Sequence, residues 1–147
     1  MTDAATTRMM EPPIGPDSAP FWEATRSGRL LLQWCISCEK PVFYPRAFCP
    51  QCGGDSSGLE WREASGRGVI HAVTVEHRPE ATGAAFSGGQ PYAVALIELE
   101  EGVRMLSNVI GCPPEQATIG TAVSVTWEPL SDGRQLPQFR PQSPAAT

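Results

Sequence analysis

The sequence lacks the features that mark membrane proteins and secreted proteins. Its 147 residues contain no apolar run of about eighteen, the length that a membrane-spanning helix requires. The N-terminal stretch MTDAATTRMMEPPIGPDSAP has no apolar region of the kind found in secretory signals. These absences predict a cytoplasmic protein that does not enter a membrane.

Positive charge is also scarce. The chain has 11 Lys and Arg against 16 Asp and Glu, a net charge of −5, and no lysine follows Lys40. An acidic chain repels polyanions, and a groove for single-stranded nucleic acid needs a basic track with stacking aromatic rings. Trp61, Tyr92 and Trp127 supply rings but no such track accompanies them. Nucleic-acid binding is therefore disfavoured and stays as an alternative function.

Groups that could serve as a catalytic base are few. The histidines are His71 and His77, six residues apart in a predicted strand, so both are expected on one face, packed or facing water. Cys112 is expected to be a half-buried small apolar residue at a strand end. The glycine-rich stretch at 86–90 leads into a strand and lacks the helix N-terminus of a phosphate-binding loop. We predict no catalytic residue, and a stand-alone CoA-thioester enzyme is a second alternative.

The sequence does contain a cluster of four cysteines within eighteen residues. Two Cys-x-x-Cys pairs, separated by ten residues, hold Cys35, Cys38, Cys49 and Cys52. In a reducing compartment, thiols so spaced are typical of a structural zinc site, and iron accepts the same ligands. Four thiolates fill the coordination sphere, so the metal would hold the fold without catalysing a reaction. Two glycines follow the second pair and allow a tight turn, whereas the first pair lacks that glycine.

A short helix is predicted ahead of the cysteines. Residues 18–28 carry its signals, with Ser18 as the N-cap, Pro20 in the first turn and Gly28 at the end. The apolar run LLLQW then predicts a strand that leads into the first cysteine pair. Residues 1–17 are polar and rich in proline, and we expect them to be disordered.

The remainder of the chain is rich in predicted strands. One long strand, bent by glycines near its middle, is expected over residues 59–79, and PYAVALIELE and VRMLSNVIG should form a hairpin that turns at Gly102. TAVSVTWEP alternates, with Val123, Val125 and Trp127 on one face. LPQFRP is expected as a short segment at a sheet edge. Four or five such strands favour an OB-fold barrel over another small open barrel or a sandwich.

The same blocks, in this order, carry a family resemblance. FWEATRSGRLLLQWCISC, CPQCG, SGRGVIHAVTVEHRP, PYAVALIELEEGVRMLSNVIG, IGTAVSVTWEP and LPQFRP resemble the zinc-ribbon/OB-fold family of acyl-CoA-associated proteins, long known as domain of unknown function thirty-five. The resemblance implies a mainly β protein with an N-terminal helical segment, a rubredoxin-like zinc ribbon that uses the four cysteines, and a C-terminal OB-fold barrel. The expected parts are a disordered segment at 1–17, a helix and leading strand at 18–34, the ribbon at 35–57, the barrel at 58–141 and a tail at 142–147.

The resemblance also implies an accessory role. Members of this family accompany thiolase-like enzymes as small non-catalytic subunits, and the partners are thiolases, aldolases or acyltransferases that process acyl-CoA in lipid or steroid metabolism. We therefore expect a hetero-oligomer in which this chain bridges or stabilises a thiolase-like partner. In that complex the chain could also bind or channel the acyl-CoA.

Three side chains are predicted to contact a partner or ligand. Phe21 and Trp22 form an apolar patch on the predicted helix, where packing on the ribbon and contact with a partner are both open interpretations. Phe86 lies in the loop at residues 78–91, which is long for a hairpin connection. This loop could dock a partner, cover an acyl chain or be a flexible surface loop.

Overall fold

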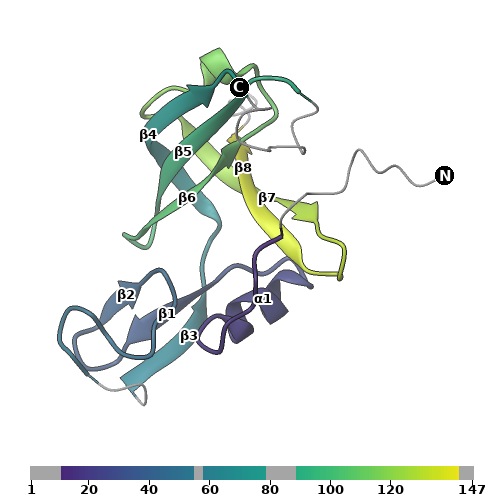
Figure 1. Cartoon of the computed structure of the whole chain (residues 1–147). Coiled ribbons are helices and arrows are strands. Elements are labelled where there is room, and N and C mark those ends of the chain that lie inside the picture. Colours follow the sequence, from purple (N-terminus) through teal and green to yellow (C-terminus); the bar gives the residue numbers. More distant parts are fainter. Residues whose placement is uncertain (1–10, 55–57, 79–88, 143–147) are drawn as a thin grey trace.

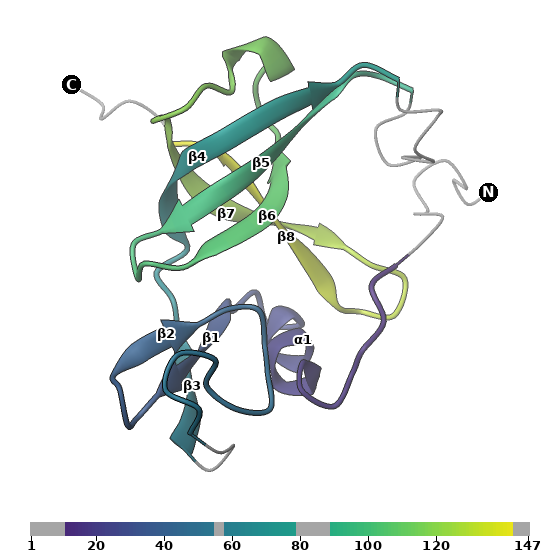
Figure 2. The same ribbon diagram turned by 60° about the vertical axis from the view of Figure 1, so that its left-hand side comes forward.

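A computed structural model describes residues 11–54, 58–78 and 89–142 as a three-stranded sheet, a closed β-barrel and one helix (Figure 1). The sheet and the barrel form opposite ends of the molecule, and the helix lies beside the sheet (Figure 2). No helix in these ranges is long and apolar enough to cross a membrane. The elements are α1 (Ala19–Thr25), β1 (Leu31–Cys35), β2 (Lys40–Val42), β3 (Leu59–Glu63), β4 (Arg67–Glu76), β5 (Tyr92–Leu99), β6 (Arg104–Val109), a short 3-10 helix η4 (Pro114–Gln116), β7 (Ala122–Pro129) and β8 (Gln135–Pro141).

The barrel closes in the order β4-β5-β6-β8-β7, with β7 pairing again with β4. Its neighbouring strands are antiparallel, except that β6 and β8 meet in parallel at Val109 and Phe139. This is the five-stranded Greek-key arrangement of an OB-fold, so the predicted fold is confirmed. The segment LPQFRP, expected at a sheet edge, is instead part of the strand that closes the barrel, because β8 lies between β6 and β7.

The core of the barrel is formed by side chains that alternate along the strands between buried and less buried positions. In β5 every second residue is buried, while the residues between them are half-buried. Val123 of β7 and Phe139 of β8 are fully buried, and Val125 and Trp127 pack against the same cluster, in agreement with their predicted common face. The helix and the segment that follows it extend this core with four buried side chains: Phe21, Trp22, Leu30 and Leu32.

The prediction of a single bent strand over residues 59–79 is wrong, because the chain passes from one sheet to the other within this range. Leu59–Glu63 pairs with β1 in the three-stranded sheet, and the barrel, expected from residue 58, begins only at Arg67. The change occurs at Gly66, which has a φ of +81°. A Cβ on Gly66 would lie 2.6 Å from the Val125 side chain, so the crossing between the sheets requires glycine.

The helix begins and ends close to where the sequence predicts. Ser18 occupies the N-cap position, but its hydroxyl accepts the Gly15 N–H at 3.0 Å and caps no N–H of the helix. Gly28, with a φ of +68°, follows the last turn. Thr25 joins the helix to β8, since its hydroxyl accepts the Gln135 N–H at 3.1 Å and its carbonyl accepts the Gln135 side-chain amide at 2.9 Å.

A buried arginine ties the N-terminal segment to the helix and the barrel. Arg134 is 5% exposed and donates to the Asp132 carboxylate at 2.7 Å and to the Pro12 carbonyl at 2.8 Å. Its guanidinium also lies over the Trp22 ring. Glu11 accepts two further hydrogen bonds from the same turn between β7 and β8. The described end of the N-terminal segment is therefore held against the barrel, although the sequence predicted disorder there.

A bulge at His71 changes which residues of β4 face the core. The pairing with β5 shifts register between Ile70 and Ala72. Ile70 is buried before the shift, and Val73 packs against the core after it. Regular alternation therefore does not run from His71 to His77, which removes the reason for placing both histidines on one face.

Candidate metal centre and apolar pocket

The two cysteine pairs meet at one end of the three-stranded sheet. Cys35 ends β1 and Cys38 follows in the turn to β2, whereas Cys49 and Cys52 lie in the long connection between β2 and β3. The four Sγ atoms all lie within 4.8 Å of one another. Across the two pairs, the Cys35 and Cys52 sulfurs are 3.6 Å apart and the Cys38 and Cys49 sulfurs are 3.7 Å apart.

The two separations across the pairs are close to those of a tetrahedral thiolate site. Zinc–sulfur bonds of about 2.3 Å place the sulfurs at the corners of a tetrahedron with edges of about 3.8 Å. None of the cysteines forms a disulfide. The four side chains are therefore arranged to bind one metal ion, and a tetrathiolate site has no open position for a substrate or a water molecule.

The two Cys-x-x-Cys turns have similar backbones despite their different sequences. The Glu39 N–H donates to the Cys35 carbonyl at 2.8 Å, and the Gly53 N–H donates to the Cys49 carbonyl at 2.9 Å. Both donors have a positive φ, +57° for Glu39 and +72° for Gly53. The first pair thus makes the same turn without the glycine, which forces a glutamate into the left-handed region.

The thiols of the cluster differ in acidity. Backbone N–H groups, that of Cys52 first and then that of Gln51 at 3.4 Å, lower the pKa of Cys49 to about 6. Burial and the neighbouring thiols raise the pKa of Cys38 to about 12. One sulfur is therefore ready to act as a thiolate, whereas a second needs a cation close by before it loses its proton.

The fifth cysteine takes no part in this cluster. Cys112 is half-buried and packs against the core of the barrel, as expected for a small apolar residue. Among the described residues, the candidate metal ligands are therefore the four clustered cysteines.

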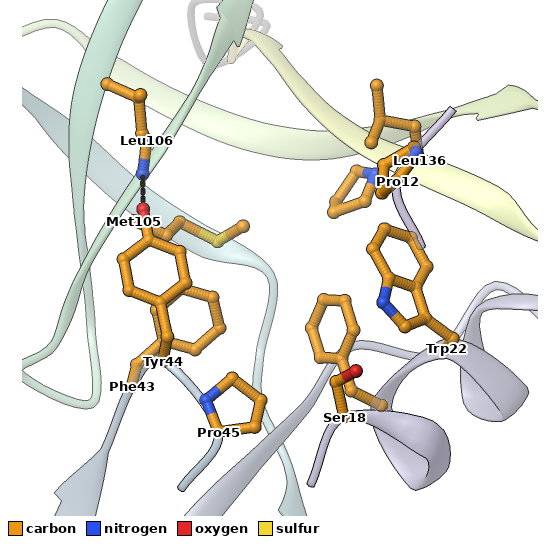
Figure 3. Close-up of a pocket in the computed structure, with 11 residues that line it drawn as sticks. Pro12, Ser18, Trp22, Phe43, Tyr44, Pro45, Met105, Leu106 and Leu136 are labelled. Carbon is orange, nitrogen blue, oxygen red and sulfur yellow. Dashed lines mark hydrogen bonds between the residues drawn. The ribbon is translucent and has the colours of Figure 1, made fainter. Parts of the chain in front are cut away.

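A pocket of about 370 Å³ lies where the helix, the three-stranded sheet and the barrel meet (Figure 3). Its walls come from five separate parts of the chain. Ring contacts, at centroid distances of 5.0 Å for Phe21 with Trp22 and 6.0 Å for Phe21 with Phe43, link the helix to the connection after β2. The Leu106 N–H donates to the Tyr44 hydroxyl at 3.1 Å and ties that connection to the barrel. The lining residues are Pro12, Ser18, Phe21, Trp22, Phe43, Tyr44, Pro45, Met105, Leu106, Leu136 and Pro137.

Of the three side chains predicted to contact a partner, two lie within the described residues and one lies outside them. Phe21 and Trp22 are buried within the chain and form part of the pocket wall, which agrees with packing inside the molecule. Their contact with a partner stays a prediction. Phe86 lies outside the described residues, and so does most of the loop at 78–91.

Sequence reasoning missed most of this pocket. Met105 and Leu136 come from strands about thirty residues apart, and only the folded barrel brings them near the helix. The one local signal is the aromatic pair Phe43-Tyr44 between two prolines. Such a pair does not reveal what it will pack against.

Comparison with known proteins agrees with both parts of this architecture. Residues 22–58 match the family described as "ChsH2, rubredoxin-like zinc ribbon domain", and residues 61–128 match "ChsH2, C-terminal OB-fold domain". Among solved structures, a chain of the "Ltp2-ChsH2(DUF35) aldolase" is 35% identical with a TM-score of 0.76, and the match covers 89% of this chain and 98% of that one.

Curated relatives give the same grouping. A "Probable enoyl-CoA hydratase alpha subunit" of Thermomonospora curvata is 36% identical over 135 residues, and this chain spans 40% of its length. A "DUF35 domain-containing scaffold protein" of Methanothermobacter thermautotrophicus is 34% identical over 98 residues, which are 67% of this chain and 71% of that protein. The chain therefore belongs to the DUF35 family of ChsH2-type proteins, in which a rubredoxin-like zinc ribbon precedes a C-terminal OB-fold domain.

Proposed function

We propose that this chain is an accessory, scaffold-type subunit that binds an enzyme of acyl-CoA metabolism and has no catalytic site of its own. The observation that carries the proposal is the match to a chain of the "Ltp2-ChsH2(DUF35) aldolase", over 98% of that chain at 35% identity. The relative named as a scaffold protein supports the same role. The likeness to the aldolase chain covers 89% of this chain and so includes both the ribbon and the barrel, which supports a role for the joined domains.

The partner that we propose is a thiolase-like enzyme, with which the chain forms a hetero-oligomer. One similar solved structure is named as an aldolase, and one relative is named as an enoyl-CoA hydratase subunit. These names support a partner whose substrate is held as a CoA thioester. In this arrangement the chain bridges or stabilises the partner and helps to bind or channel the acyl-CoA. Steroid or lipid metabolism and a cytoplasmic location belong to the same proposal.

Zinc is the metal that we propose for the cysteine cluster. Zinc prefers four tetrahedral ligands and takes four thiolates in closed structural sites, in agreement with the sulfur separations of 3.6 and 3.7 Å. In this role Cys35, Cys38, Cys49 and Cys52 hold the ion, and the ion fixes the two turns against each other. Iron, which accepts the same ligands, would hold the fold in the same way.

Neither alternative function gains support from a particular feature of the described residues. Arg67 pairs with Glu100 at 2.9 Å and Arg104 approaches Glu98 at 3.5 Å, so these barrel arginines face carboxylates and do not form a free basic track. His71 also faces Glu98, at 3.6 Å, and both side chains are open to solvent. Single-stranded nucleic acid and independent thioester chemistry are thus less well supported than a scaffold.

The test is an affinity purification of the tagged chain from its native host, with mass spectrometry of the proteins that elute with it. We expect a thiolase-fold enzyme in near-stoichiometric amount, and an increase in the activity of that enzyme when the purified chain is added back. A chain that elutes alone, or with nucleic acid that salt releases, would argue against the scaffold role.

A further inference from the structure

The pocket between the helix, the sheet and the barrel has a buried inner wall and an open rim. Phe21 and Met105 on the inner wall are 5% and 3% exposed, whereas Tyr44 and Leu106 at the rim are 50% and 59% exposed. Figure 3 shows the labelled side chains arranged around one hollow, with Tyr44 and Met105 on one side and Trp22 on the other. A molecule can therefore enter from solvent and reach buried apolar surface.

The chemistry of the walls favours an uncharged ligand. None of the lining residues carries a charge. The buried Arg134, which lies over the Trp22 ring, is already bonded to Asp132 at 2.7 Å. The Tyr44 hydroxyl accepts the Leu106 N–H, so its own proton remains to be donated. An ion would lose its hydration here without meeting an opposite charge among the lining residues, whereas a neutral acceptor oxygen has less hydration to lose and could accept the Tyr44 proton.

The volume sets the size of that ligand. At about 30 Å³ for each water-sized group, 370 Å³ holds roughly a dozen such groups. Water in an apolar hollow of this size has few hydrogen-bond partners, and its release favours binding. We infer that the pocket is a binding site for a small uncharged molecule with an apolar body of about a dozen non-hydrogen atoms and one hydrogen-bond acceptor, such as a carbonyl oxygen. This inference does not depend on the proposed scaffold role.

A matched set of probes tests the inference on the full chain. We expect 2-acetylnaphthalene to bind at one site in equilibrium dialysis. The near-isostere 2-ethylnaphthalene lacks the acceptor and should bind about fivefold more weakly, as expected for one lost hydrogen bond. The anion 2-naphthoate should bind at least about tenfold more weakly than the ketone, because its charge loses hydration and meets no opposite charge among the lining residues. No saturable binding of the ketone, or naphthoate binding as tightly as the ketone, would overturn the inference.

Two tryptophan variants locate the site. Leu106→Trp places an indole at the rim and should weaken binding of the ketone by about tenfold or more, since the entrance is filled. Ile119→Trp is the matched control, because Ile119 is 70% exposed and does not line the pocket, so its binding should equal that of the wild type. Equal affinities for the two variants would place the probe elsewhere and overturn the inference.

A readout on the unaltered protein avoids any effect of these substitutions on folding. Met105 lies on the inner wall, and no other methionine is present among the described residues. In a sample labelled at the methionine methyl carbons, saturation with 2-acetylnaphthalene should shift the Met105 resonance, which Met105→Leu identifies by its loss. A Met105 resonance that stays in place while the probe binds would also overturn the inference.

Discussion

At the scale of single residues, the two cysteine turns show how one backbone can be made by two sequences. Gly53 adopts its φ of +72° without steric cost, whereas Glu39 adopts +57° in the equivalent position of the first turn. A residue with a Cβ loses roughly 1 to 2 kcal/mol in the left-handed region. The first turn is therefore maintained by its surroundings, including the hydrogen bond of Glu39 N–H to the Cys35 carbonyl at 2.8 Å.

This strain predicts that Glu39→Gly stabilises the metal-loaded protein. Relief of the left-handed strain should exceed the greater flexibility of glycine in the unfolded chain, for a net gain of about 0.5 to 1 kcal/mol in the free energy of unfolding. Denaturant unfolding of the metal-saturated variant measures the change. Gly53→Ala is the reciprocal control and should lose about 1 kcal/mol. A variant at Glu39 less stable than the wild type would contradict this account of the turn.

At the scale of elements, closure of the barrel depends on the start of β4. Gly68 pairs with Leu99 of β5 on one side and with Val123 of β7 on the other. A Cβ on Gly68 would lie 2.4 Å from the Glu98 carbonyl oxygen, which belongs to the backbone of the neighbouring strand. Because backbone cannot move aside without breaking the pairing, this glycine permits the close approach of the strands.

We predict that Gly68→Ala destabilises the barrel by about 1 to 3 kcal/mol, the usual range for a side chain forced into occupied space. Thermal unfolding followed by circular dichroism tests it. Gly15→Ala serves as the control, because a Cβ there would meet only the Ser18 hydroxyl, at an ordinary contact distance of 3.8 Å, so its stability should change by less than about 0.5 kcal/mol. If the two variants unfold at the same temperature, the close approach is not what glycine provides at position 68.

At the scale of the whole molecule, the described residues form two apolar clusters of unequal size. The larger cluster joins the helix and the barrel through Phe21, Trp22 and Leu32. The smaller one contains Cys35, Val42 and Cys49 and lies at the metal-binding end of the sheet. Since the smaller cluster is made largely of the cysteines themselves, its stability should depend on the metal far more than that of the barrel does.

Removal of the metal should therefore loosen one end of the protein first. After chelation, amide hydrogen exchange should accelerate in β2 and the two cysteine turns while β5 keeps most of its protection, because local openings follow local packing. Exchange measured by mass spectrometry, beside the metal content of each sample, tests this. Cys49→Ser should reproduce the effect of chelation, and Cys112→Ser should retain the metal. Equal loss of protection in β2 and β5 would mean that the clusters unfold as one unit.

What the sequence by itself determined is local or periodic. The spacing of the four cysteines predicted their meeting, alternation predicted β7, and the signals from Ser18 to Gly28 predicted the helix. These features depend on backbone geometry over a few residues, so the residues themselves carry the information.

Only the tertiary structure decided which strands pair and what they enclose. The sequence of Leu59–Glu63 predicted the start of a barrel strand, but this segment completes the sheet of β1. The sequence of β8 predicted an edge segment, but this strand closes the barrel. A strand pattern records which face is buried but not which neighbour supplies the hydrogen bonds, because those partners lie far away along the chain. The apolar pocket follows the same rule, since its walls come from five segments that only the completed fold brings together.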